Sequence, residues 1–212
     1  MVWIISGITI SYLIGSIPTA YIFVRFLKGV DIRQVGSGNV GATNASRILG
    51  KPLGITVLLL DIFKGFLVVF FMGNFIVPRV ESISGDVIRM LLGLSCIYGH
   101  NWTIFLAFKG GKGVATTIGV LLGLAVKISG LMLIFCLVIS TWLLVFIVSG
   151  IISLSSVIAG ISLPIFMILF KKPPALIILS LILSLFIILR HKENLKRLSC
   201  GKEPRFNFRK SP

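Results

Sequence analysis

The composition of this chain argues against a water-soluble globular domain. Of its 212 residues, 56% are hydrophobic and only 13% are charged, whereas soluble domains carry about 25% charged residues. The 21 Lys and Arg outnumber the six Asp and Glu, giving a net charge of +15, and such an excess attracts nucleic acid, anionic lipid or an anionic substrate. In so apolar a chain we expect lipid and anionic substrates as partners, and no nucleic acid.

Six apolar segments are candidates for helices that cross a bilayer core of about 30 Å, which needs roughly 20 residues. In chain order they are Val2 to Phe26, Leu53 to Val77, Val87 to Phe108, Ser129 to Ser149, Ile151 to Phe170 and Pro174 to Leu189. A seventh, Gly113 to Lys127, is shorter. The sequence predicts an all-α polytopic membrane protein, one integral membrane domain over residues 1–212, with seven transmembrane helices or with six plus a short or re-entrant one.

The basic residues predict how these helices are oriented, because Lys and Arg in short loops prefer the cytoplasm. With seven spans and the N-terminus outside, fifteen Lys and Arg lie inside, including the tail from Arg190 to Lys210, and five lie outside. Lys64 remains within a span, one turn from Asp61, where the two can neutralise each other or serve a functional site. The same topology puts the C-terminus and three polar stretches on the cytoplasmic face, so we expect one shared site there.

The first polar stretch, GSGNVGATNASR, runs from Gly36 to Arg47. Its glycines match G-x-G-x-x-G, but a dinucleotide-binding fingerprint needs a preceding strand and a parallel sheet, which this sequence does not predict. We instead expect a loop whose backbone N–H groups turn inward to bind an anion. Arg47 can add a bidentate fork, and further donors are Ser37, Asn39, Thr43 and Asn44. The alternative is an ordinary flexible connector.

The second stretch, GHNWTIFLAFKGGKGVATT, runs from Gly99 to Thr117 and places Lys109 and Lys112 on either side of two glycines. Two cations beside bare backbone can hold a dianion. The stretch is not a Walker loop, since Gly113 follows Lys112 where that motif has Ser or Thr. The alternative is that both lysines only anchor the helices on the cytoplasmic side.

The third stretch, RHKENLKRLSCGKE, follows the last apolar segment from Arg190 to Glu203. On a continuing helix His191 and Asn194 share one face, so the pair could bind one polar ligand. Histidine can also exchange protons near neutral pH. The alternative is that His191 is a solvated anchor. Neither His191 nor His100 has the neighbouring ligands that a zinc site needs.

These three stretches, with GSIPTAY at Gly15 to Tyr21 and DIR at Asp31 to Arg33, resemble the PlsY family of bacterial membrane acyl-phosphate:glycerol-3-phosphate acyltransferases. The order GSGNVGATN, FKGGKGVAT, RHKENLKRL carries the resemblance, which extends from the first span to the tail. One departure is Thr103, where the family commonly has Pro; it bears on local helix geometry more than on chemistry.

The resemblance implies transfer of a fatty acyl group from acyl phosphate to the sn-1 hydroxyl of glycerol 3-phosphate. The products are lysophosphatidate and phosphate, and the reaction is the first acylation step of phospholipid synthesis. The implied location is the bacterial inner membrane, with the active site on the cytoplasmic face. The partners are acyl phosphate, glycerol 3-phosphate, membrane lipid and, through functional coupling, the enzyme that makes acyl phosphate. No metal or organic cofactor is implied.

By the same resemblance, the loop from Ser37 to Asn44 cradles the phosphate of acyl phosphate, Arg47 with Lys109 or Lys112 holds glycerol 3-phosphate, and His191 with Asn194 orients its glycerol part. Glu203 matches a structural acid. The implied catalytic residues are Ser37, Arg47, Lys109, Lys112, His191 and Asn194. The substrate-binding set adds Gly36, Gly38, Asn39, Gly41, Thr43, Asn44, Gly110 and Gly111.

No catalytic triad is expected, because acyl phosphate is already activated; the hydroxyl proton passes to the phosphate itself or to His191. A His followed five residues later by Asp, the motif of the other glycerol phosphate acyltransferase class, is absent. Thioesters of coenzyme A or acyl carrier protein are therefore not the expected donors.

Two other function classes would also use several spans and a basic face. A transporter of phosphorylated metabolites usually has its site near the bilayer midplane and often has inverted repeats, and this sequence shows neither feature. A lipid-binding scaffold would account for the basic face but not for the glycine-rich loop.

Overall fold

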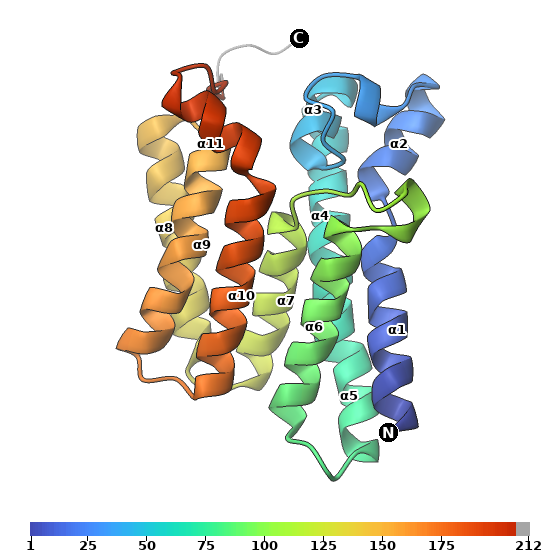
Figure 1. Cartoon of the computed structure of the whole chain (residues 1–212), viewed down its shortest axis with the longest axis vertical. Helices are drawn as coiled ribbons and strands as arrows, with labels where there is room; N and C mark the ends of the chain where they lie inside the picture. Colours follow the sequence, from blue (N-terminus) through green and yellow to red (C-terminus); the bar gives the residue numbers. More distant parts are fainter. Residues whose placement is uncertain (207–212) are drawn as a thin grey trace. The chain divides into compact units, whose positions relative to one another are not determined.

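The computed structural model describes residues 1–206, and within this range all regular secondary structure is helical, with no β-strand. Figure 1 shows the helices in chain order. The chain divides into two compact units, residues 1–128 and the residues from Ser129 onward. Arg209 and Lys210, which the sequence places in the basic tail, lie outside the described residues.

The first unit contains seven α-helices with four short 3-10 or π segments between them. In order these are α1 (Val2–Ser16), α2 (Thr19–Lys28), η1 (Ile32–Gln34), α3 (Ala42–Leu49), α4 (Lys51–Leu67), η2 (Val68–Met72), α5 (Gly73–Ile76), η3 (Val77–Arg79), α6 (Gly85–Asn101), η4 (Ile104–Leu106) and α7 (Val114–Lys127). Helix α1 packs on α6, and α4 packs on α7. Figure 1 shows α3 and the 102–113 loop toward the end of this unit that lies away from Met1.

Glycines let these helices approach closely. A Cβ at Gly15 of α1 would collide with the backbone of Cys96 in α6, and one at Gly119 of α7 would collide with the carbonyl of Ile62 in α4. Small residues at crossings allow this backbone contact, which is how helices gain packing energy in an apolar solvent.

The first expected span, Val2 to Phe26, is broken into α1 and α2 at Ile17 and Pro18. Proline has no N–H to donate to the preceding turn and its ring crowds the carbonyl four residues earlier, so the helix cannot run through it regularly. Together α1 and α2 still form one apolar segment long enough to cross a membrane, Val2–Lys28.

The third expected span, Val87 to Phe108, is wrong at its end, because α6 stops at Asn101. Beyond it the chain turns: Ala107 and Phe108 have φ of 50° and 61°, which no α-helix contains. Thr103, at φ −70°, lies inside the range that proline imposes. Its buried hydroxyl donates to the carbonyl of Ser16 at 2.6 Å and accepts from the N–H of Phe105 at 3.2 Å.

A π-helical segment, η2, interrupts the second expected span, and a buried arginine accompanies it. Arg89 of α6 donates to the carbonyl of Val69 at 2.8 Å and to the side-chain oxygen of Asn74 at 2.8 Å. A π segment shifts the backbone hydrogen-bond register, so some carbonyls need a partner from outside the helix. Arg89 supplies that partner from the neighbouring helix.

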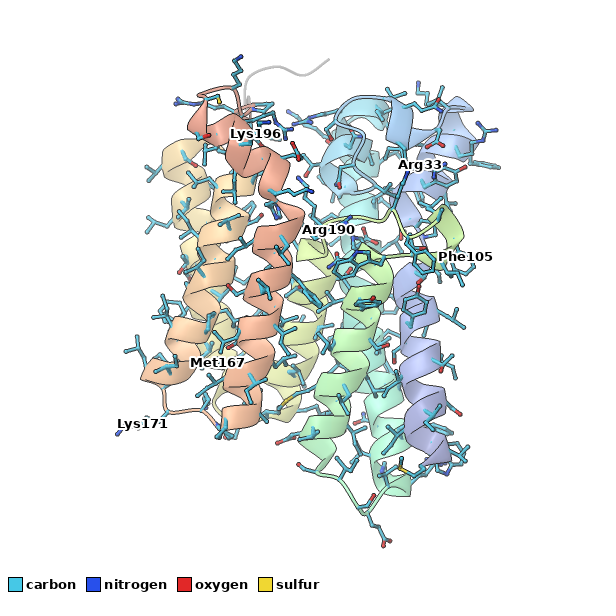
Figure 2. The ribbon with its side chains drawn as sticks, in the orientation of Figure 1. Arg33, Phe105, Met167, Lys171, Arg190 and Lys196 are labelled. Carbon is cyan, nitrogen blue, oxygen red and sulfur yellow. The ribbon has the colours of Figure 1, made fainter. Side chains whose placement is uncertain are left out.

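The second unit contains α8 (Leu131–Ser149), α9 (Ile152–Leu169), α10 (Pro174–Arg190) and α11 (Lys192–Ser199). Helix α9 packs against both α8 and α10. The expected turn from Lys171 to Pro174 joins α9 to α10. In Figure 2, Lys171 and Lys196 lie at opposite ends of this unit, with Arg190 nearer to Lys196.

Four helical segments are long and apolar enough to cross a membrane: Val2–Lys28, Lys51–Arg79, Leu131–Ser149 and Ile152–Leu169. A fifth is α10 if it is counted with α11, from which it is bent by 60°. The described chain is thus an all-helical, multi-pass membrane protein. Helix α7 has 14 residues and is a shorter apolar helix, as the sequence predicts.

Replacing Arg89 by Met should lower the free energy of unfolding by about 1–3 kcal/mol, because the carbonyl of Val69 and the amide of Asn74 lose a buried charged donor. The measurement is unfolding in detergent micelles. The matched change at exposed Arg79 should cost less than about 0.5 kcal/mol. Equal losses for both variants would show that Arg89 has no special part in the π segment.

Candidate active site

The first polar stretch is a loop only as far as Gly41. Gly36 and Gly38 have φ of 65° and 69°, the left-handed conformations that glycine adopts without strain. The expectation of a loop to Arg47 is wrong, because α3 begins at Ala42 with Gly41 as its N-cap. Thr43, Asn44 and Arg47 therefore lie on a helix, which forms because it can bury Ala45 in the apolar core.

Asn44 holds the glycine loop in shape. Its side-chain oxygen accepts from the N–H of Ser37 at 2.9 Å, and its side-chain nitrogen donates to the carbonyls of Ile32 and Val35 at 3.2 and 3.0 Å. The side chain is only 1% exposed. The structure thus gives both polar atoms of the Asn44 side chain backbone partners. Ser37, Thr43 and Arg47 are exposed and can be reached by a ligand.

The second stretch forms a buried glycine turn between two lysines. The N–H of Gly110 donates to the carbonyl of Asn101 at 3.2 Å, and that of Gly111 donates to the carbonyl of His100 at 3.0 Å. A Cβ at Gly110 would collide with the same His100 carbonyl, and one at Gly111 would collide with the imidazole. Only glycine fits at either position. Lys109 is exposed and Lys112 is half-buried.

The first and second stretches meet. Val40 and Leu106 belong to one buried apolar cluster, and the carbonyl of Val40 lies 2.9 Å from where a Cβ of Gly111 would stand. A cavity of about 10 Å³, enough for about one water molecule, lies between Val40, His100, Thr103, the two glycines and the Gly15–Thr19 turn. The GSIPTAY segment thus borders both stretches.

Beneath the glycine turn lies a buried cluster of ionisable side chains. Lys64 of α4 approaches Asp61 at 2.8 Å and the Nδ1 atom of His100 at 2.9 Å. The hydroxyl of Thr19 donates to Asp61 at 3.0 Å. Pairing of Asp61 with Lys64 was expected from their spacing, but the link to His100 was not, because 36 residues separate it from Lys64.

The third stretch, in the second unit, does not continue the preceding helix. Helix α10 ends at Arg190, and the chain bends by 60° before α11. His191 caps the first helix, and its Nδ1 lies 2.8 Å from the carbonyl of Ile187. His191 and Asn194 are 3% and 8% exposed. A solvated anchor at His191, the alternative considered from the sequence, is therefore wrong.

The carboxylate of Glu203 accepts hydrogen bonds from three polar side chains of this region. It accepts from the amide of Asn194 at 2.6 Å, from the hydroxyl of Ser153 at 2.7 Å and from Arg197 at 2.8 Å. Burial alone would raise the pKa of the Glu203 carboxyl, but the hydrogen bonds from Asn194, Ser153 and Arg197 together lower it below its usual range. Ser153 lies 50 residues away in sequence, and no local motif pointed to it.

In the described part of the chain, no three His, Cys, Asp or Glu side chains are grouped as a metal site would require. The site therefore offers an anion two glycine-rich turns, the exposed side chains of Ser37, Arg47 and Lys109, and half-buried Lys112.

The family model described as glycerol-3-phosphate acyltransferase matches residues 5–201, a range that includes the first two polar stretches and the third as far as Gly201. The chain belongs to the glycerol-3-phosphate acyltransferase family. It is 42% identical to glycerol-3-phosphate acyltransferase 2 of Moorella thermoacetica, covering 98% of this chain and 99% of the relative. It is 39% identical to the enzyme of Fusobacterium nucleatum, covering 95% and 97%.

Solved structures agree with this membership. The chain resembles the crystal structure of PlsY, an integral membrane glycerol 3-phosphate acyltransferase, in its glycerol 3-phosphate form, with a TM-score of 0.82 and 36% identity over 96% of each chain. The lysophosphatidic acid form of PlsY matches with a TM-score of 0.80 and 35% identity, over 96% of this chain and 95% of that one.

The contacts of Asn44 predict a severe effect of Asn44→Asp. A carboxylate keeps the acceptor for Ser37 but brings negative charge against the carbonyls of Ile32 and Val35. We expect at least a tenfold loss of acyltransfer and faster amide exchange at Ser37, while exposed Gln34→Ala stays within about twofold. Amide exchange that stays slow in Asn44→Asp would contradict this account of the loop.

Glu203 should also make stability depend on pH. Because its folded-state pKa lies below the usual value of 4.5, its contribution is present above that value and is lost as the pH falls through the folded-state pKa. Thermal unfolding in micelles between neutral pH and pH values below 4.5 should show this loss, and Glu203→Gln should flatten it. Exposed Glu193→Gln is the control; a slope that survives Glu203→Gln would assign the effect to another group.

Proposed function

We propose that this chain transfers a fatty acyl group from acyl phosphate to the sn-1 hydroxyl of glycerol 3-phosphate, releasing lysophosphatidate and phosphate. One observation carries the proposal: the Gly36–Gly41 loop and the Lys109–Lys112 turn meet within the first unit, and the Ser37 hydroxyl and the cations Lys109 and Lys112 lie on them. Both substrates carry phosphate, and acyl chains are soluble in the bilayer that surrounds the helices.

The solved relatives support this choice of acceptor and product. PlsY is described in a glycerol 3-phosphate form and in a lysophosphatidic acid form. These are the acceptor before acyl transfer and the product after it.

Acyl phosphate is the donor that suits these residues. Attack of the hydroxyl oxygen on the acyl carbon breaks the bond from that carbon to the phosphate oxygen, and phosphate leaves with its electron pair. Backbone N–H groups and cations placed around the phosphate stabilise the charge that develops there. A mixed anhydride is already reactive, so positioning and charge neutralisation can suffice without a covalent enzyme intermediate.

Each candidate residue has a role in this proposal. The Ser37 hydroxyl in the Gly36–Gly41 loop binds the leaving phosphate, and Arg47 with Lys109 or Lys112 binds the phosphate of the acceptor. Asn44 acts through the loop that it shapes. His191 and Asn194 orient the glycerol hydroxyls.

The geometry at His191 bears on the proton acceptor. A carbonyl oxygen only accepts hydrogen bonds, so the 2.8 Å contact with Ile187 requires the proton on Nδ1. In the neutral ring the lone pair then lies on Nε2, the atom that can accept a proton. In this proposal the proton of the sn-1 hydroxyl passes either to this nitrogen or to the phosphate itself.

We also propose the topology and location. Seven spans, the N-terminus outside and the C-terminus in the cytoplasm would put the site at the inner face of the bacterial inner membrane, where glycerol 3-phosphate is available. The two compact units would then work as one acyltransferase domain over residues 1–212. Functional coupling to the enzyme that makes acyl phosphate would supply this donor directly, because its apolar chain dissolves poorly in water.

The experiment is to supply the purified protein with palmitoyl phosphate and glycerol 3-phosphate and to measure phosphate and lysophosphatidate together. We expect equal amounts of both products, and losses of at least about a hundredfold in well-folded Ser37→Ala, Arg47→Ala, Lys112→Ala and His191→Ala, since such groups supply several kcal/mol to a transition state. Lys171→Ala, in the turn after α9, is the control.

Two outcomes would overturn the proposal. Turnover of palmitoyl coenzyme A at a comparable rate would refute acyl phosphate as the specific donor. A folded parent that is inert with every donor would refute acyl transfer, and flux of glycerol 3-phosphate into sealed vesicles would then identify a transporter.

A further inference from the structure

The buried cluster of Asp61, Lys64 and His100 has no part in the reaction proposed above. The three side chains are 2%, 7% and 8% exposed. They come from α4 and from the end of α6, one residue before the chain leaves that helix. Ionisable groups inside a membrane are costly to bury, so their presence calls for a role.

Hydrogen bonding fixes the state of the histidine. A lysine ammonium has three donors and no acceptor, and Lys64 has three acceptors: Asp61 Oδ1 at 2.8 Å, His100 Nδ1 at 2.9 Å and the carbonyl of Ile17 at 3.2 Å. Because Lys64 can only donate to His100, Nδ1 carries the lone pair. The proton of the neutral imidazole must then be on Nε2.

The Nε2 edge of His100 faces the glycine turn. A Cβ at Gly111 would collide with Nε2, and the carbonyl of His100 accepts from the N–H of Gly111 at 3.0 Å. The imidazole ring and the backbone carbonyl of His100 therefore both contact the glycine turn. Lys109 and Lys112, the cations assigned to glycerol 3-phosphate, flank that turn.

We propose that Lys64, with Asp61 as its counter-ion, is a positioning residue for acyl transfer: it holds His100 as the Nε2–H tautomer, and His100 fixes the turn that carries Lys109 and Lys112. The inference rests on the proposed function, because it assigns those lysines to glycerol 3-phosphate. Stability alone is a weak reason for the cluster, since apolar residues of equal volume often replace a buried ion pair without loss.

The decisive test compares two substitutions of His100. Asparagine can place an acceptor where Nδ1 stands but leaves the Nε2 position empty, whereas glutamine can place an N–H donor near Nε2 and leaves the Nδ1 position poorly filled. If positioning of the turn matters, His100→Gln should keep the KM for glycerol 3-phosphate within about threefold, and His100→Asn should raise it at least tenfold.

The opposite order would overturn the proposal. If the cluster only balances buried charge, His100→Asn, which still accepts from Lys64, should be the better enzyme and should unfold at the higher temperature. Equal KM values for the two variants would also overturn it. Ser11→Ala, a buried change on α1 whose hydroxyl bonds to the carbonyl of Gly7 and contacts the sulfur of Met72, is the control and should alter neither KM nor kcat.

A second measurement does not depend on activity. The sequence has two histidines, so ¹⁵N NMR of histidine-labelled protein, assigned with His100→Asn, reports which ring nitrogen of His100 is protonated. We expect Nε2–H in the parent and loss of that single tautomer in Asp61→Asn/Lys64→Met, which leaves no lone buried charge. An unchanged signal in the double variant would refute the role of Lys64. A parent inert in acyl transfer would refute the proposed function and leave this test of the tautomer intact.

Discussion

A protonated amine inside an apolar helical unit must satisfy three donors without water, and Lys64 does so with acceptors from three places in the chain. One is Asp61 on its own helix, one is the Ile17 carbonyl at the break between α1 and α2, and one is His100 at the end of α6. The Ile17 carbonyl lies where the first span is interrupted, and His100 lies where the 102–113 loop is about to begin. These two departures from regular helix are therefore linked through the Lys64 side chain.

The apolar segments predicted the helices well because burial in lipid demands continuous runs, whatever the tertiary contacts. Helix ends were predicted less well. Helix α6 stops at Asn101, although apolar residues continue to Phe108, because the backbone of Asn101 and His100 accepts hydrogen bonds from the glycine turn. Helix α3 was missed because its stretch is rich in polar residues and glycine, and Ala45 is the one fully buried apolar residue of this helix. The bend at His191 has no local signal at all.

Residue type and spacing predict anion sites in the glycine-rich stretches, but they do not predict which residues of these stretches bond to the protein's own backbone. The sequence predicts that Asn44 binds the substrate phosphate. In the structure, the polar atoms of its side chain bond to the backbone and hold the glycine loop in shape. Ser153 and His100 carried no motif that pointed to their partners, Glu203 and Lys64. Contacts between residues 36 or 50 positions apart depend on packing, which periodicity along the chain does not encode.

Thr103 has a consequence for how this loop can change in evolution. Proline at this place would restrict φ covalently, which stabilises a protein by roughly 0.4–1 kcal/mol through the unfolded chain. Threonine reaches φ −70° without that restriction and adds a hydrogen bond to Ser16, worth about 0.5–1.5 kcal/mol. The two solutions are similar in size but act on opposite sides of the folding equilibrium. A lineage can therefore exchange proline for threonine at this position at almost constant stability. The exchange gives up the restriction of the unfolded chain and gains a hydrogen bond between the 102–113 loop and α1.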